Sequence, residues 1–368
     1  MPPVAAPMPE SIAVGVQDSV STTADLRELD EMDMALVDAL QTSPRAPWSR
    51  IGAVLGIDAT TAARRWDRLR AAGLAWSTAY ETWERHEPRD GLCIAFAEVA
   101  VAPGSLTAAT AAACADPRVA SVERTTGGTS GRDAALFLTL FCSSTAALTR
   151  LADGPLAELP GVRDIQLAVM LHSYREGADW KVHALDRGQR SRLASARVGG
   201  ASGLHRGGAD RALLRALAFD ARRPYSELAR DTGTSEATVR RRVARMLASG
   251  QVRLRCDVSH LAAGRPVIST YRIAVPSAEL DAAGHLVAGL SGVRLCMAVT
   301  GETNLLVSTW TSSLSESAAF EVRLGTRLPA ARILRRDVTL LTTKRMGRLL
   351  DDAGRARGHV PLVPHQTS

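Results

Sequence analysis

Cysteine is sparse in this chain of 368 residues and forms no recognisable pattern. The five cysteines stand far apart and contain no C-x-x-C pair; they are Cys93, Cys114, Cys142, Cys256 and Cys296. An odd, scattered set excludes a disulfide framework and lacks the spacing of a zinc site. We therefore expect no metal and no cofactor, and we expect the reducing cytoplasm as the location.

Long apolar runs are also missing. No stretch approaches the roughly 18 apolar residues that a membrane-spanning helix needs, so we expect no contact with a membrane. Residues 1–28 contain prolines and acidic residues but no basic segment followed by an apolar core. We interpret them as a flexible leader rather than a signal peptide. Aromatic residues make up only 4% of the chain, but the hydrophobic content of 46% argues against disorder.

Motifs of well-known enzymes do not occur. The sequence holds no H-E-x-x-H, G-x-S-x-G, P-loop or dinucleotide-binding fingerprint. Its eight histidines are spread along the chain, and only His172, His183 and His205 share a neighbourhood. We therefore predict no catalytic residues and a protein that is not an enzyme.

The length and charge of the chain set the first positive expectations. A chain of 368 residues is too long for one compact core, so we expect about two to four domains. The formal net charge of +7 permits a nucleic-acid partner without requiring one.

An internal repeat organises the chain. Residues 33–75 align without a gap with residues 210–252, at a constant offset of 177 positions. The matches fall on turn glycines such as Gly56 and Gly233, on apolar positions, and on arginines. Further along, the matches continue with gaps; for example, Thr126-Gly127 aligns with Thr300-Gly301. The whole unit is therefore duplicated.

Each copy begins with three short helical patterns. In the second copy, leucines at helical spacing mark the first helix, and Leu228 marks the buried face of the next. Gly233 then supplies the conformation of a tight turn, Ser235 is a good N-cap for a third helix, and Gly250 is a good stop. Two helices joined by a glycine-bearing turn form a helix-turn-helix unit.

The third helix of each copy carries the predicted contacts to double-stranded DNA. Val239, Val243 and Met246 form one apolar stripe, and most arginines fall outside it. In a helix-turn-helix, the N-terminal end of this helix enters the major groove, where arginine reads guanine edges or binds phosphates. The predicted DNA-binding residues are Ser235, Glu236, Thr238, Arg240, Arg241, Arg242 and Arg245 in the second copy, and Thr61, Arg64, Arg65 and Arg68 in the first.

Charge separates the two copies. Residues 205–256 hold twelve arginines and five acidic residues, whereas residues 29–76 hold six of each. Because phosphate neutralisation drives non-specific affinity, we expect the second unit to dominate DNA binding. The first unit is then either a weaker reader or a structural remnant. The alternative for both is that the arginines only solvate a helix face.

After each helical unit the pattern changes to β-α-β-β-α-β, which is typical of a ferredoxin-like domain. We thus predict an α+β fold with two winged or plain helix-turn-helix domains, each followed by a ferredoxin-like βαββαβ domain. The predicted segments are a leader (1–28), helix-turn-helix 1 (29–76), a connector (77–90), ferredoxin-like domain 1 (91–176), a linker (177–203), helix-turn-helix 2 (204–252), a connector (253–266), ferredoxin-like domain 2 (267–346) and a tail (347–368). The predicted strands and helices are 93–101, 106–115, 119–124, 135–141, 145–151 and 165–172 in copy one, and 267–275, 278–290, 293–300, 305–310, 315–324 and 333–342 in copy two.

On these motifs the sequence resembles the Lrp/AsnC family of transcriptional regulators. The segments that carry the resemblance are Ser226–Ala229, Gly233–Ser235, Thr238–Val243, Gly250–Val252, Val299–Leu306 and Leu328-Pro329. The resemblance implies tandem RAM-type ferredoxin-like domains that self-associate and bind a small effector, often an amino acid. It places the effector near Gly301, Glu302, Thr303 and Asn304, where Asn stands for the acidic residue of the family pattern. The alternative for this segment is a plain β-turn.

Two other functions stay open at this point. Siroheme decarboxylases resemble the same double module, so a related enzyme is one alternative. A sensor or assembly protein without DNA binding is the other. Because ordinary members of the family carry one copy and dimerise, the duplication suggests that one chain mimics a dimer with two readers.

Overall fold

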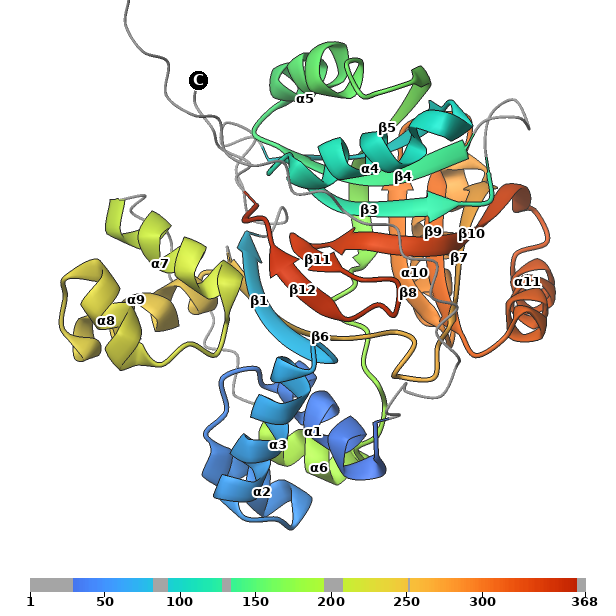
Figure 1. Cartoon of the computed structure of the whole chain (residues 1–368). Helices are drawn as coiled ribbons and strands as arrows, with labels where there is room; N and C mark the ends of the chain where they lie inside the picture. Colours follow the sequence, from blue (N-terminus) through green and yellow to red (C-terminus); the bar gives the residue numbers. More distant parts are fainter. Residues whose placement is uncertain (1–28, 82–91, 128–133, 195–207, 251, 363–368) are drawn as a thin grey trace, which may run out of the picture.

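The computed structural model describes residues 29–81, 92–127, 134–194, 208–250 and 252–362 (Figure 1). The expected leader, most of the first expected connector (82–91), the loop 128–133, the end of the expected linker with the start of helix-turn-helix 2 (195–207), residue 251 and the last six residues of the expected tail lie outside the described residues. The chain combines helices and sheet as expected, and the predicted α+β fold class is confirmed.

Two three-helix units, which we name helical modules 1 and 2, stand apart from the sheets (Figure 1). Module 1 consists of α1 (Glu31–Thr42), α2 (Trp48–Leu55) and α3 (Ala59–Ala71), and module 2 of α7 (Gly208–Phe219), α8 (Tyr225–Thr232) and α9 (Glu236–Ala248). Helices α2 and α8 end at Gly56 and Gly233, whose φ angles of 72° and 62° are left-handed. Glycine adopts this conformation without steric cost, which explains the turn in both modules.

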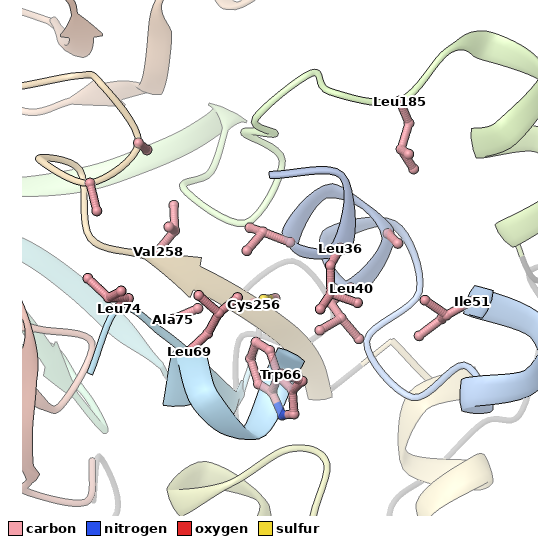
Figure 2. Close-up of a cluster of buried hydrophobic side chains, with 14 of the residues drawn as sticks. Leu36, Leu40, Ile51, Trp66, Leu69, Leu74, Ala75, Leu185, Cys256 and Val258 are labelled. Atoms are coloured by element: carbon pink, nitrogen blue, oxygen red, sulfur yellow. The ribbon is translucent and has the colours of Figure 1, made fainter. Parts of the chain in front are cut away.

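The core of module 1 extends beyond its own helices. Leu36, Leu40, Trp66 and Leu69 are fully or almost fully buried and pack together with Cys256 from the second half of the chain (Figure 2). In module 2 the buried residues are Leu213, Leu217, Leu228, Ala229, Val239, Val243 and Met246, and they pack with Ala79 and Val252 from the strands that follow the modules. Each module is therefore anchored to the adjoining strands by apolar contacts.

A two-stranded ribbon follows the modules. Strand β1 (Ala75–Glu81) pairs antiparallel with β6 (Val252–Val258), from Ala75 opposite Val258 to Glu81 opposite Val252. These residues include parts of the two segments for which the sequence predicted connectors. Local pattern did not reveal the strands because each has its partner about half a chain away. The ribbon joins the two copies directly after α3 and α9 in the chain.

The expected linker also contains structure. Helix α6 (Arg187–Leu193) packs on module 1, and Leu185 and Leu193 enter its core. The buried carboxylate of Asp38 accepts hydrogen bonds from the Leu185 backbone at 2.8 Å and from Arg190 at 2.9 Å. The interpretation of residues 177–203 as a simple linker is therefore wrong for residues up to 194, because tertiary contacts order them.

Each ferredoxin-like unit contributes four long strands and two α-helices. The first contains β2 (Cys93–Val101), α4 (Leu106–Ala115), β3 (Val119–Thr125), β4 (Ala134–Cys142), α5 (Thr145–Leu151) and β5 (Val162–Arg175). The second contains β7 (Val267–Ala274), α10 (Leu280–Ala288), β8 (Val293–Val299), β9 (Leu305–Thr311), α11 (Leu314–Arg327) and β10 (Arg332–Arg345). This order is the one that the alternating apolar pattern predicted. Short strands β11 (Arg348–Leu350) and β12 (Ala356–His359) extend the sheet within the expected tail.

The two four-stranded sheets join at both edges and form a closed ring. The long strands β5 and β10 make this possible because each serves both sheets. Strand β5 pairs first with β2 and then with β8, and β10 pairs first with β7 and then with β3. Inside the ring lies an apolar cluster that includes Phe96, Phe137, Phe141, Met170 and Met297. Closure gives hydrogen-bond partners to backbone groups that would lie at exposed edges in two separate sheets.

Charged residues of β10 lie at one of these seams. Arg272 of β7 and Arg335 of β10 form ion pairs with Glu98 of β2, and both also pair with Asp337, at 3.5 and 3.1 Å. Two buried or half-buried cations thus meet two carboxylates. This network gives Arg335 and Asp337 of the last strand charged partners.

No helix within the described ranges is long and apolar enough to cross a membrane. In the same ranges, no group of three or more His, Cys, Asp or Glu side chains is arranged to hold a metal ion.

Candidate nucleic-acid interface

The orientation of α9 is fixed by its buried face. Ser235 caps the helix by accepting a hydrogen bond from the Thr238 backbone at 3.2 Å. Val239, Val243 and Met246 are at most 2% exposed and pack into the core of module 2. The opposite face is therefore held toward solvent by the packing of these three side chains.

Three of the predicted arginines of α9 are exposed. Arg241 and Arg245 make no ion pair with any residue that the structure describes, and they lie one turn apart. Arg240 pairs with Glu236 at 2.7 Å, and its guanidinium lies 5.0 Å from the centre of the Tyr225 ring. An exposed pair of this kind is weak, so it leaves Arg240 able to exchange partners.

Arg242 and Thr238 differ from the other predicted residues. Arg242 is half-buried and points toward α7, with its Nε atom 3.9 Å from Asp210. The Thr238 hydroxyl accepts a hydrogen bond from Ser235 Oγ at 2.9 Å. Arg242 thus lies at the packed side of the helix, whereas Ser235, Glu236, Arg241 and Arg245 are exposed.

The first module has the same helix but different charge pairing. Arg64 is exposed and Thr61 half-buried, whereas Arg65 pairs with Asp30 and Asp33 at 2.7 and 2.8 Å. Arg68 pairs with Asp33 at 2.5 Å. At the repeat offset the position of Asp30 is occupied by a glycine in the second copy, and Asp210 takes the place of Asp33. Asp30 and Asp33 therefore neutralise Arg65 and Arg68 in α3. At the repeat offset Arg68 corresponds to Arg245, which makes no ion pair with any residue that the structure describes.

A symmetric contact holds the two modules together. We name it the inter-module clamp; it consists of Arg45, Trp48, Arg222 and Tyr225, and the repeat offset relates its two halves. Arg45 donates to the backbone oxygens of residues 221 and 223, at 2.6 and 3.0 Å, and lies 4.1 Å from the Tyr225 ring centre.

Arg222 repeats this arrangement in the opposite direction. It donates to the backbone oxygens of residues 44 and 46, at 2.6 and 3.2 Å, and lies 3.9 Å from the Trp48 ring centre. Burial, with a smaller contribution from Arg45, lowers the pKa of Arg222 to about 10, so the side chain stays charged at neutral pH. Such reciprocal contacts are the signature of a two-fold interface, which here lies within one chain.

The clamp was missed from the sequence, although a signal existed. Arg45 and Arg222 match at the repeat offset, as do Trp48 and Tyr225. A cationic residue three positions before an aromatic one in both copies could have indicated a reciprocal contact. The pattern alone did not show that the two turns meet.

The predicted effector segment lies in the turn between β8 and β9. Gly301 adopts φ 118°, and the Asn304 side chain bonds both the N–H and the C=O of Val275, at 2.9 and 2.8 Å. Asn304 therefore ties the turn to the end of β7. Glu302 is exposed, and Thr303 is half-buried. The role of these residues in effector binding stays a prediction.

Comparison with known proteins identifies the family. A model of the AsnC-type helix-turn-helix domain matches residues 29–70 and 209–247. An uncharacterized HTH-type transcriptional regulator of Pyrococcus furiosus is 30% identical over 112 residues, which are 30% of this chain and 76% of that protein. The chain belongs to the Lrp/AsnC family. It is thus a tandem member of a family of DNA-binding transcriptional regulators.

The chain is also similar to solved structures. The siroheme decarboxylase NirDL is 15% identical with a TM-score of 0.54, and the match covers 86% of this chain and 93% of that chain. The leucine response regulatory protein LrpA of Mycobacterium tuberculosis is 26% identical with a TM-score of 0.34, over 36% of this chain and 92% of that chain.

The likeness to NirDL corrects one prediction. We predicted from the absence of catalytic motifs that the Lrp/AsnC-type chain is not an enzyme. That prediction is wrong, because an enzyme has the same double module over nearly its whole length. The motifs that we searched for belong to other folds, so their absence excludes nothing here.

Proposed function

We propose that this Lrp/AsnC-type chain binds DNA that carries two half-sites, with α9 as the main reader and α3 as a weaker one. The observation that carries the proposal is the exposure of Arg241 and Arg245 on a helix whose other face is fixed by packing. Both guanidiniums are without ion-pair partners among the described residues, so binding to phosphate or guanine costs no existing pair.

The weaker role of α3 follows from charge. Arg65 and Arg68 would have to leave Asp30 and Asp33 before they bind DNA, and the carboxylates would repel the phosphates. Only Arg64 is exposed and without an ion pair among the described residues of α3. Fewer free cations release fewer counterions, which lowers affinity.

The inter-module clamp supports two readers at one fixed separation. In a dimeric helix-turn-helix protein, the symmetry of the dimer sets the distance between half-sites. Here the clamp and the β1–β6 ribbon make the corresponding contacts within the chain. We infer that one chain occupies both half-sites without a second copy.

The test compares two double variants of the full chain on DNA fragments that the wild type selects from its source genome. Arg241→Ala with Arg245→Ala removes two exposed arginines spaced one turn apart on α9. Arg323→Ala with Arg327→Ala removes an exposed pair with the same spacing on α11, far from the modules. The net charge change is the same in both variants.

We expect the α9 variant to lose about 30-fold or more in affinity, because each arginine contact contributes about 1–3 kcal/mol. The slope of log affinity against log salt should fall by about 0.9 for each lost phosphate contact. The α11 variant should bind as the wild type does in fluorescence anisotropy. Equal losses in the two variants would mean that only total charge matters, and undiminished binding of the α9 variant would refute α9 as the reader.

A further inference from the structure

A cavity opens into the β-ring on the side of the ribbon. The cavity measures about 120 Å³. Apolar side chains of both sheets line it, among them Phe96, Phe137, Phe141, Met170 and Met297. Since one water needs about 10–15 Å³, the space suits a molecule of on the order of ten non-hydrogen atoms. An apolar interior of this size at the mouth of a β-barrel is a common place for a ligand.

Three buried arginines form the polar end of the cavity. Arg255 of β6, Arg294 of β8 and Arg345 of β10 all line it, and they are 7%, 6% and 4% exposed. The guanidiniums of Arg294 and Arg345 lie 3.7 and 4.7 Å from the centre of the Trp310 ring. Stacking against this ring limits how far the two cations can move.

The carboxylates around these arginines are Asp257 and the cavity-lining Glu81, Glu123 and Glu176. Arg255 and Arg294 both pair with the buried carboxylate of Asp257, with Nη2-to-Oδ1 distances of 2.7 Å in each case. Glu123 lines the cavity nearby, and its carboxylate accepts a hydrogen bond from Thr339 at 3.2 Å. Burial raises the pKa of Glu123, and the neighbouring Arg345 opposes this shift.

Arg345 makes no ion pair with any residue that the structure describes. Its Nη2 atom donates to Thr342 Oγ1 at 3.2 Å, but its Nη1 atom is buried and meets no hydrogen-bond partner in the part of the chain that the structure describes. The other buried arginine cluster, Arg272 and Arg335, is balanced by two carboxylates. Glu123 and Asp257 lie close enough to stabilise the charge of Arg345, but no ion pair joins it to either carboxylate, and its buried Nη1 atom leaves a hydrogen bond unmade.

We propose that the cavity is a binding site for a small molecule with one carboxylate and an apolar body. The carboxylate meets Arg345, whose planar fork of donors matches the two oxygens of that group. The apolar body lies among the aromatic and methionine side chains of the ring interior. This site is separate from the turn at Gly301–Asn304, none of whose residues lines the cavity.

Two sources of such a ligand differ in one group. A simple carboxylic acid presents only the anion, whereas an α-amino acid also presents an ammonium group. Of the cavity-lining carboxylates, Glu123 lies beside Arg345 and could receive that ammonium group. The experiment therefore includes probes with and without it.

The experiment measures binding to the full chain by isothermal titration calorimetry, without DNA. The probes are phenylacetate, L-phenylalanine and the neutral 2-phenylethanol, which share the phenyl group. We expect one of the two carboxylates to bind at least tenfold more tightly than 2-phenylethanol. Preference for phenylacetate indicates a simple acid, and preference for L-phenylalanine, lost in Glu123→Gln, indicates an amino acid.

Two variants locate the site. Arg345→Gln should remove the preference for the carboxylate while 2-phenylethanol binding stays the same. Ser308→Phe places a bulky side chain into the cavity from β9 and should abolish binding of every probe. If Arg345→Gln does not fold, Ser308→Phe and the comparison of probes on the wild type still decide the question. Equal affinity for acid and alcohol, absence of binding by both acids at millimolar concentration, or full binding by Ser308→Phe would overturn the proposal.

Discussion

The inter-module clamp makes a quantitative prediction about how DNA is read. Replacing Arg222 by alanine removes hydrogen bonds to two backbone carbonyls, at 2.6 and 3.2 Å, and the stack on Trp48. Each bonded carbonyl contributes about 1 kcal/mol net, and the stacked ring about 1 kcal/mol. A loss of about 3 kcal/mol lowers the ratio of docked to undocked modules by about a hundredfold.

The consequence is measurable as a change in spacing preference. Wild-type protein should bind DNA best when its two half-sites have one separation, and insertion of about 5 base pairs, half a helical turn, should weaken binding because the second half-site then faces away. In Arg222→Ala this penalty should shrink by tenfold or more, because only the Arg45 half of the clamp then holds the two turns together. Affinity for a single half-site should change by less than about twofold.

A neighbouring variant supplies the control. Arg230→Ala removes an exposed arginine from α8, the helix that follows Arg222, and its side chain makes no ion pair among the described residues. It should keep the wild-type spacing preference in fluorescence anisotropy titrations. The clamp does not set the half-site separation if Arg222→Ala keeps the full spacing penalty. The same conclusion follows if the wild type binds every spacing with equal affinity.

Three further predictions follow from charge and burial. Burial, with Arg345 and Arg294 nearby, lowers the pKa of His260 to about 3, so the unfolded chain binds the proton more readily than the folded chain. The free energy of unfolding should therefore fall as the pH drops below about 6.5, by about 2 kcal/mol at pH 5. Urea titrations should show a flatter pH dependence for His260→Gln. The five cysteines are buried, and burial raises the pKa of Cys142 to about 12, so a thiol reagent should label none of them until denaturant is added; fast labelling of the native chain would contradict this. Asp30→Asn keeps the helix cap but removes a charge beside Arg65, and it should increase DNA affinity by a few fold with a steeper salt dependence, whereas unchanged binding would argue against α3 as a reader.

Helix geometry and its apolar stripe could be predicted because they are local. The spacing of Val239, Val243 and Met246, the cap at Ser235 and the turn at Gly233 each depend on residues within a few positions. The structure places all of them as the pattern indicated. The same holds for most strands of the two ferredoxin-like units.

Charge pairing could be predicted only in part. Twelve arginines in one copy and six in the other pointed to a difference between the readers. That Arg65 and Arg68 bind Asp33, whereas Arg245 stays unpaired, depends on how α1 lies against α3 in each module. Composition records the number of charges and not their distances.

From the amino-acid order alone came the duplication, the helix-turn-helix units and the alternation that makes each βαββαβ unit, since all of these are repeated local patterns. Tertiary structure decided how the copies combine: the ribbon of β1 with β6, the closure of two sheets into a ring, and the reciprocal contacts of Arg45 and Arg222 with the turn of the other module. It also brought Arg255, Arg294 and Arg345 from three separate strands to one cavity. Contacts between residues that lie far apart in the chain leave no periodic trace in it, because they arise only when the strands pair and the modules dock.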